Sequence, residues 1–436
     1  METLKLIMAL SQKYFKESAW VVFGQIGVVI ASFLFIKKLS SSLSVEDYGI
    51  IGVALAIVGI NYTLLFGPLI NSYNRFFSIS KKKNQMYIYR KAVNKTWRIA
   101  AKILFLVYFF IFLFLMVFNY KEYSLGLILV FIFSIFQSLK NKNVAIIQAA
   151  RKRKLVGLIQ NSELWIRVIF ILIVSLFWSS NILIFSIPFF VGIISAFIIS
   201  EILLKSIFIF NKKEVVNNQK HLQNEMVDFS RPYYFWGAFV SLQQSSDRIS
   251  LSKFGNLNDT GIYTAIFQIG NSPISMFFGI FNTIVSPIIY EKYNKFDLED
   301  QEFMSLKKFF NQAIIFFTLI ILTSSFISYL FSDKIVLFFL DQKYFNFSNF
   351  LPLVILSAGL LSLGEFLGLY FSTRNKQNIL IKIKIPTSIL IVLSNVIFAI
   401  YYGVTGVIIS VLSFSIIYFL VIYLLFYLDT SKINKR

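Results

Sequence analysis

The sequence predicts an all-α integral membrane protein with twelve transmembrane helices in two six-helix lobes. Of its 436 residues, 57% are hydrophobic and 18% aromatic, whereas only 14% are charged, against about 25% in ordinary soluble domains. Apolar runs such as "ILFLVYFFIFLFLMVF" (103–118) recur along the whole chain. Each comes close to the ~20 residues that a helix needs to cross a bilayer. The alternative, a large soluble core of buried helices, is disfavoured by the number of such runs.

The positions of the apolar runs place the individual elements. The predicted spans are 19–38, 49–70, 99–118, 124–147, 157–178, 182–204, 231–253, 259–284, 308–331, 350–372, 379–402 and 405–428. Before them, "METLKLIMALSQKYFKES" (1–18) has no signal-peptide cleavage pattern, and we expect an amphipathic helix on the membrane surface. The expected domains are an N-lobe at 19–210, a cytoplasmic linker at 211–230, a C-lobe at 231–428 and a basic tail at 429–436.

The distribution of basic residues sets the orientation. Of the 42 Lys and Arg, 31 fall before the first span, after the last, or in alternate loops, whereas six lie at the other side. Basic loops stay in the cytoplasm, so we expect both chain ends there and an even number of spans. Clusters such as "KKK" (81–83) and "RKRK" (151–154) are therefore first of all topology and lipid head-group signals. Their arrangement also argues against nucleic acid as the partner of a chain with net charge +21.

Residue usage excludes several kinds of chemistry. The chain has no Cys, so it has neither a disulfide framework nor a thiolate metal site, and its one histidine, His221, lies in a polar segment. Histidine-based catalysis or metal binding inside the membrane is therefore not expected, and no cofactor is predicted. The external loops are short. We therefore predict a transporter rather than an enzyme.

The two halves of the chain resemble each other. "FG" at 23–24 is followed by "EDYGI" at 46–50, and "WG" at 236–237 is followed by "NDTGIY" at 258–263. The acidic residue before the second glycine is expected to be the N-cap of the next helix. A second match pairs 148–160 with 370–382. These offsets predict a six-plus-six parallel repeat, an arrangement that transporters use around a central cavity; chance similarity between apolar helices is the alternative.

Charged side chains at membrane depth are the candidate functional residues, because each costs ~2.5–3.5 kcal/mol to insert and normally faces the protein interior or a hydrated cavity. In span 7, Gln244 and Arg248 share a helical stripe with three serines, and Gln243 and Asp247 lie beside it. We expect this stripe to face a hydrated lumen, with packing against neighbouring helices as the alternative.

Three further places carry such residues. In span 5, Glu163 precedes Arg167 by four residues, the favourable order for a helical ion pair. Glu365 in span 10 is a lone carboxylate and a candidate proton site, unless it bonds to a neighbouring helix. Asn71 and Arg75 extend a polar face at the end of span 2.

Prolines predict where helices bend. Pro68 would kink span 2 by removing a backbone hydrogen bond, and Pro273 and Pro287 are expected to break span 8.

Three phrases resemble a known family. "EDYGI" (46–50), "SSDRISLSKFGNLNDTGIYTAIFQIG" (245–270) and "SNVIFAIYYGVTGVIISVLSFSIIY" (394–418) are similar to the Wzx-type polysaccharide flippases of the MATE-like MOP transporter superfamily. The resemblance extends over nearly the whole chain in length, span count and orientation. It implies outward translocation of an undecaprenyl-diphosphate-linked oligosaccharide across the bacterial cytoplasmic membrane, for O-antigen or capsule assembly, with a polymerase and a chain-length regulator as partners.

On this hypothesis Arg248 and Arg167 bind the diphosphate, since arginine stays charged and its planar fork matches phosphate oxygens. Gln243, Gln244, Asn71 and Arg75 contact the head group, and membrane lipids surround the protein. Asp247, Glu163 or Glu365 couples transport to H+ or Na+. The alternatives are a MATE-like exporter of cationic compounds, which would favour an acidic lumen, and a membrane polymerase or ligase, which would need catalytic groups in a sizeable outer loop.

Overall fold

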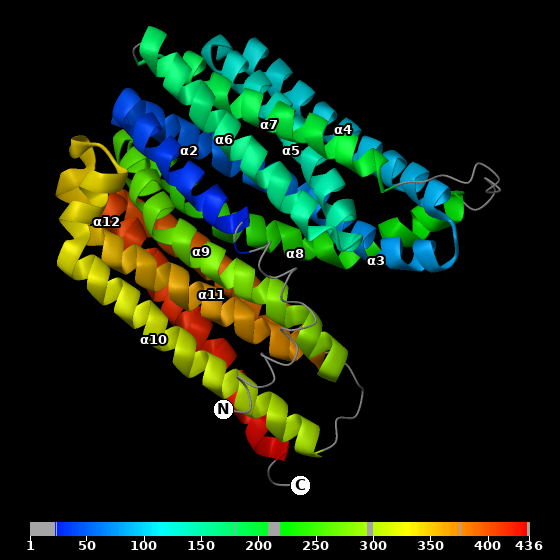
Figure 1. Cartoon of the computed structure of the whole chain (residues 1–436). Helices are drawn as coiled ribbons and strands as arrows, with labels where there is room; N and C mark the ends of the chain where they lie inside the picture. The colour runs from blue at the N-terminus through cyan, green and yellow to red at the C-terminus, as the bar shows by residue number, and fades with distance from the viewer. Residues whose placement is uncertain are drawn as a thin grey trace. The chain divides into compact units, whose positions relative to one another are not determined.

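The computed structural model describes residues 22, 24–178, 180–207, 219–293, 300–374 and 376–433, and every regular element in these ranges is helical (Figure 1). The first helix covers Gly24–Ser42. The others are α2 (Val45–Asn61), η1 (Tyr62–Phe66), α3 (Gly67–Lys82), α4 (Met86–Val117), η2 (Lys121–Tyr123), α5 (Ser124–Ala149), α6 (Arg153–Phe177), α7 (Ile182–Lys205), α8 (Gln219–Phe254), α9 (Leu257–Tyr293), α10 (Asp300–Phe339), η4 (Gln342–Phe350), α11 (Leu351–Thr373) and α12 (Gln377–Ile433). The all-helical prediction is confirmed.

Every predicted span falls on helical residues to within one residue, the first from residue 24 onward, and 49–70 runs through α2, η1 and the start of α3. Within the described ranges, nine helical stretches are long and apolar enough to cross a membrane, and the one at Ile379–Thr430 has 52 residues. The two polar-rich helices α8 and α9 do not meet that measure of apolarity. The chain is thus a multi-pass membrane protein, whereas twelve crossings and the orientation stay predictions.

The helices group into two compact units, which we describe separately. Unit 1 comprises Met1–Gly52 and Ser246–Arg436, and unit 2 comprises Val53–Ser245. The expected lobes at 19–210 and 231–428 stay a prediction. Residues 1–18 and 211–218 lie outside the described residues, and residues 219–230 of the expected linker form the first turns of α8.

In unit 2, α7 packs against α5 and α6, and α3 packs against α4 and α5. The two packed pairs α6–α7 and α3–α4 are both visible in Figure 1. In unit 1, α11 lies between α9, α10 and α12 (Figure 1). Its apolar stretch is 61% buried, more than that of any other candidate span. Small residues allow this burial, because Gly359 contacts Ile321 and Gly364 contacts the Tyr418 ring.

Three helices of unit 2 end in the same hydrogen-bonded motif. Asn84, Asn119 and Arg151 follow α3, α4 and α5 with φ between 54° and 65°. In each case the next amide bonds five residues back, for example Gln85 N to Ser80 O at 2.8 Å. This is the Schellman arrangement, which satisfies the last carbonyls of a helix. It explains why the short polar loops "KKKNQ" and "FNYK" end their helices without a glycine.

The N-caps of α2 and α9 differ from the prediction. Ser44 Oγ accepts from the amide of Asp47 at 3.0 Å, and Asn256 Oδ1 accepts from the amide of Asp259 at 2.6 Å. The caps are therefore Ser44 and Asn256, three residues before the acidic residues that we expected. Asp259 instead accepts from the backbone N–H of Val404, where α12 is interrupted at Gly403 (φ 55°, ψ −137°). That interruption separates the predicted spans 11 and 12.

The two repeat glycines meet inside unit 1. A Cβ on Gly49 would lie 2.9 Å from the backbone N of Gly261, and a Cβ on Gly261 would overlap the carbonyl of Val45. The N-terminal turns of α2 and α9 thus cross in backbone contact. The Gly-Ile pairs of "EDYGI" and "NDTGIY" therefore lie at matching positions of the two helices. Only glycine allows the two backbones to come this close.

Prolines act differently in the two halves. The π-helical turn η1 comes directly before Pro68, which lies in the first turn of α3, so the helix is irregular where we expected a kink. In contrast, α9 continues as one helix through residues 273 and 287. The predicted break of span 8 is wrong, since a proline removes one backbone hydrogen bond without ending a helix that its neighbours support.

Two lysines, one near the end of the first helix and one in η4, bind backbone carbonyls in unit 1. Lys37 Nζ donates to Leu337 O at 2.6 Å and Leu340 O at 2.5 Å, at the end of α10. Lys343 Nζ donates to Leu43 O, just after the first helix. Cations stabilise helix C-termini, which gives a local reason for two of the six basic residues that depart from the charge rule.

Candidate functional site

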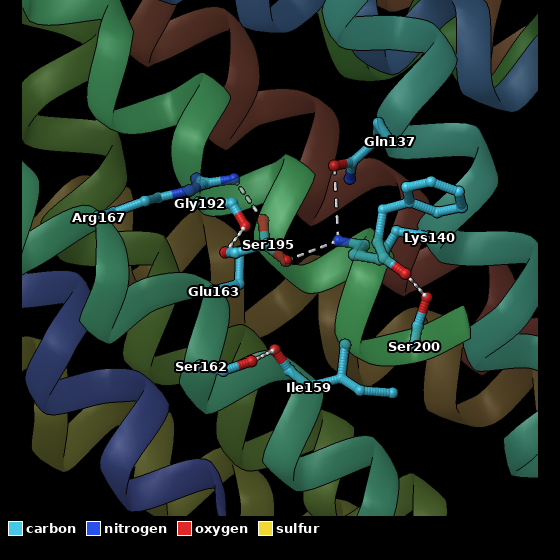
Figure 2. Close-up of polar contacts among 10 residues, drawn as sticks. Gln137, Lys140, Ile159, Ser162, Glu163, Arg167, Gly192, Ser195 and Ser200 are labelled. Carbon is cyan, nitrogen blue, oxygen red and sulfur yellow. Dashed lines mark hydrogen bonds and ion pairs between the residues drawn. The ribbon is translucent and has the colours of Figure 1, made fainter. Parts of the chain in front are cut away.

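A buried charge group connects α5 and α6 in unit 2. Glu163 Oε2 accepts from Lys140 Nζ at 2.9 Å, and Oε1 accepts from Arg167 Nη2. The three side chains are between 9% and 13% exposed. Figure 2 shows them converging, with Gln137 on the far side of Lys140. The predicted pair of Glu163 and Arg167 is therefore present, and Lys140 makes the group carry two positive charges against one negative.

Helix α7 holds the Arg167 side chain in place. A Cβ at Gly192 would overlap Cγ of Arg167 and come within 2.9 Å of its Nε. The guanidinium carbon lies 5.4 Å from the ring centre of Phe189, one turn earlier on α7. Nε itself is buried and has no hydrogen-bond partner among the described residues. The group thus contains a buried cationic N–H donor without a hydrogen-bond acceptor among the described residues.

A second pair occupies α8 in unit 1. Asp247 Oδ2 accepts from Tyr263 Oη at 2.6 Å and Oδ1 accepts from the Arg248 amide at 2.7 Å. The Arg248 guanidinium reaches Oδ1 only at 3.8 Å, and it lies 5.0 Å from the ring centre of Phe267. Both oxygens of the Asp247 carboxylate therefore accept hydrogen bonds within the protein. The Arg248 guanidinium mainly contacts the faces of the Tyr263 and Phe267 rings.

The rest of the predicted α8 stripe differs in exposure from residue to residue. Ser241, Gln243, Ser245 and Asp247 are buried, whereas Gln244 is exposed beside Leu242 and Ile249. Ser241 and Ser245 are therefore covered by protein whereas Gln244 is not, and a hydrated lumen along this stripe stays a prediction. Gln243 Oε1 is buried without a described hydrogen-bond partner.

Glu365 on α11 is not the lone carboxylate that the sequence indicated. Lys384 Nζ lies 3.8 Å from Glu365 Oε1 and 4.8 Å from the ring centre of Tyr418. The Lys384 side chain is 4% exposed and that of Glu365 is 53% exposed. The buried cation thus has a carboxylate that stays accessible.

Asn71 and Arg75 lie on the exposed face of α3. The Arg75 guanidinium packs over the ring of Phe229 at 4.4 Å, within unit 2. Neither residue joins the group around Glu163.

Unit 1 contains a cavity of about 280 Å³ between the first helix and α9. Its polar lining is uncharged and consists of Gln25, Ser32, Asn271, Ser272 and Ser275. Val28, Val29, Phe33 and Met276 complete the wall. Such a lining suits a neutral ligand with both hydroxyl groups and apolar faces.

Sequence reasoning missed the basic partners Lys140 and Lys384 and the buried group around Asn143. Asn143 Nδ2 donates to Ser200 at 3.0 Å and to Glu201 at 2.9 Å, and Glu201 pairs with Arg90 at 3.2 Å. The signal was present, since Lys140, Lys142 and Glu201 all fall inside predicted spans. Their spacing along the chain gave no indication of which helix each charge would face.

A family model described as "Polysaccharide biosynthesis protein" matches residues 14–292. No curated protein matches the chain significantly.

Solved membrane transporters have a similar fold. A multidrug resistance MATE family transporter of the MOP superfamily, in an inward-facing conformation, is 12% identical with a TM-score of 0.67, over 94% of this chain and 96% of its own. The lipid II flippase MurJ is 16% identical with a TM-score of 0.68, over 94% and 87%. The MATE transporter VcmN from Vibrio cholerae is 13% identical with a TM-score of 0.62, over 98% of both chains. The expected MATE-like fold is confirmed, and because the family model covers more than half of the sequence, the chain belongs to the polysaccharide biosynthesis protein family.

Proposed function

We propose that the protein is a flippase that moves undecaprenyl-diphosphate-linked oligosaccharides across the bacterial cytoplasmic membrane, for O-antigen or capsule assembly. One observation carries the proposal: the Glu163 group has a surplus positive charge, and its Arg167 Nε is a buried donor without a partner among the described residues. Family membership supplies the polysaccharide context.

A buried guanidinium suits a diphosphate. Both phosphates carry negative charge, and moving them through hydrocarbon without partners is prohibitive. Arginine donates several hydrogen bonds from one rigid plane and remains charged at any physiological pH. The Arg167 guanidinium offers such contacts in unit 2, and its Nε has no hydrogen-bond partner among the described residues. In unit 1, Arg248 offers another, because only a 3.8 Å approach links it to Asp247.

The sugar part requires neutral partners. The cavity in unit 1 presents one Gln, one Asn and three Ser side chains, together with the Phe33 ring. Hydroxyl and amide groups match sugar hydroxyls, and an aromatic ring matches the apolar face of a sugar. We propose that this cavity receives a saccharide unit, with exposed Gln244, Asn71 and Arg75 as further contacts.

Energy coupling is assigned to the most exposed of the three candidate carboxylates. Asp247 and Glu163 are buried and bonded on both oxygens, whereas Glu365 is half-exposed beside Lys384. We therefore favour Glu365 as the group that takes up H+ or Na+.

A MATE-like exporter of cations is the second candidate, and the fold favours it equally. Such an exporter would need carboxylates available to a cationic ligand. Instead, Glu163, Asp247 and Glu365 each have a basic neighbour within 4 Å. The pairing therefore favours an anionic substrate.

The test is deletion of the gene, followed by complementation and extraction of lipid-linked saccharides, whose leaflet is assigned by their accessibility to a membrane-impermeant reagent in intact spheroplasts. We expect complete, unpolymerised units to accumulate on the inner leaflet and the wild-type chain to restore surface polymer. Arg167→Ala should fail to restore it at equal protein level, because an anion-binding charge is lost. Arg231→Ala removes an exposed arginine that pairs with Asp228 and should restore it fully. Accumulation on the outer leaflet, or full function of Arg167→Ala, would contradict the proposal.

A further inference from the structure

Glu163 already occupies the place that a substrate anion would take. Its two oxygens bridge Lys140 and Arg167, with the Lys140 contact at 2.9 Å (Figure 2). A phosphate group binding the same two cations would present two oxygens in the same way. Glu163 therefore makes the contacts of a bound anion from within the protein.

The Arg167 guanidinium is held in position by α7. Gly192 lets α7 approach so closely that the Arg167 side chain runs along its backbone, and Phe189 lies against the guanidinium at 5.4 Å. The Nε of Arg167 is buried against Gly192, so the guanidinium is held in place on that side. To engage the planar fork, an incoming anion has to replace Glu163 at Nη2.

We propose that Glu163 is a built-in competitor for the diphosphate, exchanging places with it on Arg167 at each transport cycle; this rests on the proposed function. When the anion binds, Glu163 remains on Lys140, and no charge is left without a partner. When the anion leaves, Glu163 returns to Arg167. A buried cation that lost its anion without replacement would be strongly destabilised, so the competitor makes release favourable.

Replacing Glu163 by glutamine distinguishes a role as competitor for the anion from a role in packing alone. Glutamine has the same shape as glutamate but only one acceptor oxygen and no charge. In the Glu163→Gln variant that single oxygen can accept from Lys140 or from Arg167 but not from both, so more of the guanidinium is left free. Glu163→Met has similar length and no strong acceptor, and serves as a second variant.

The experiment measures binding of inorganic pyrophosphate to the purified, detergent-solubilised full chain by calorimetry, alongside thermal stability. We expect Glu163→Gln and Glu163→Met to lower the dissociation constant about tenfold, the equivalent of one charge-assisted hydrogen bond. Glu201→Gln removes a carboxylate of the same unit that pairs with Arg90 instead. Glu201→Gln should leave the dissociation constant for pyrophosphate unchanged. This variant controls for the loss of one negative charge from the protein.

The outcomes distinguish this inference from the function on which it rests. Unchanged or weaker binding by folded Glu163→Gln, while Arg167→Ala abolishes binding, overturns the competitor role and leaves Arg167 as the anion site. Unchanged binding by Arg167→Ala overturns the anion site itself. Equal tightening by Glu201→Gln would show a general charge effect and also overturns the competitor role.

Discussion

At the scale of single residues, each of the candidate acids Glu163, Asp247 and Glu365 has a basic side chain within 4 Å. Asp247 is bonded to Tyr263 and to the backbone of Arg248, so it positions the start of α9 against α8. Arg248 remains the more available of the two, with its guanidinium over the Phe267 and Tyr263 rings. An anion that approaches these rings would meet a partly desolvated cation, where electrostatic attraction is stronger than in water.

Arg248→Ala should reduce surface polysaccharide at least about tenfold without lowering protein level, since one charge-assisted contact contributes roughly 1.5–3 kcal/mol. Arg248→Lys should restore it only partly, because lysine keeps the charge but loses the planar group that stacks and binds in a bidentate manner. Quantitative immunoblotting of polymer and protein checks both. Lys253→Ala, at an exposed position of the same helix, should have no effect. Full activity of Arg248→Ala would remove this residue from the site.

At the scale of helices, backbone contacts at glycines and hydrogen-bonded ends explain the packing of each unit. Gly261 brings α9 against α2, Gly192 brings α7 against α6, and Gly403 interrupts α12 with a backbone conformation that other residues rarely adopt. Ser394, Asn395 and Ser410 then join the two halves of α12 through bonds of 2.6 and 2.7 Å, and Asn395 reaches Ser246 of α8 at 2.8 Å. Helix approach in unit 1 therefore depends on a few small or polar positions.

Gly261→Ala should destabilise the folded protein by at least about 1–3 kcal/mol, the range found for overpacking. The added Cβ meets the backbone carbonyl of Val45, which cannot rotate away as a side chain would. The midpoint of thermal unfolding in detergent should fall accordingly. Gly59→Ala is the matched control, since no atom lies within 4 Å of a Cβ built there. Equal midpoints for the two variants would refute the close crossing of α2 and α9.

At the scale of the whole molecule, the distribution of basic residues predicts which loops lie on each side of the membrane. The charge count places residues 71–98 inside and residues 119–123 outside. Lys82 at the end of α3 and Glu122 in η2 are both exposed. They lie at opposite ends of α4, which has 32 residues, or roughly 48 Å at 1.5 Å per residue. That length is enough to cross the membrane.

The absence of cysteine makes this test simple, because single cysteines need no altered background. In spheroplasts, a membrane-impermeant maleimide should label Glu122→Cys. Lys82→Cys should react only after permeabilisation. Complementation of the deletion strain by each variant controls for correct folding. The reverse labelling pattern would invert the topology and place both termini outside.

The membrane class, the helical segments and the family could all be predicted from the sequence. These properties follow from local quantities, namely apolar run length, the spacing of basic loops and short recurring phrases. The contact of Glu163 with Arg167 was equally predictable, because a four-residue spacing on a helix fixes it. In contrast, the folded chain was needed to bring Lys140 to Glu163 and Lys384 to Glu365, and to cover the Asp247 side of α8. Those contacts join residues on different helices, so they depend on how the helices pack, which no local pattern specifies.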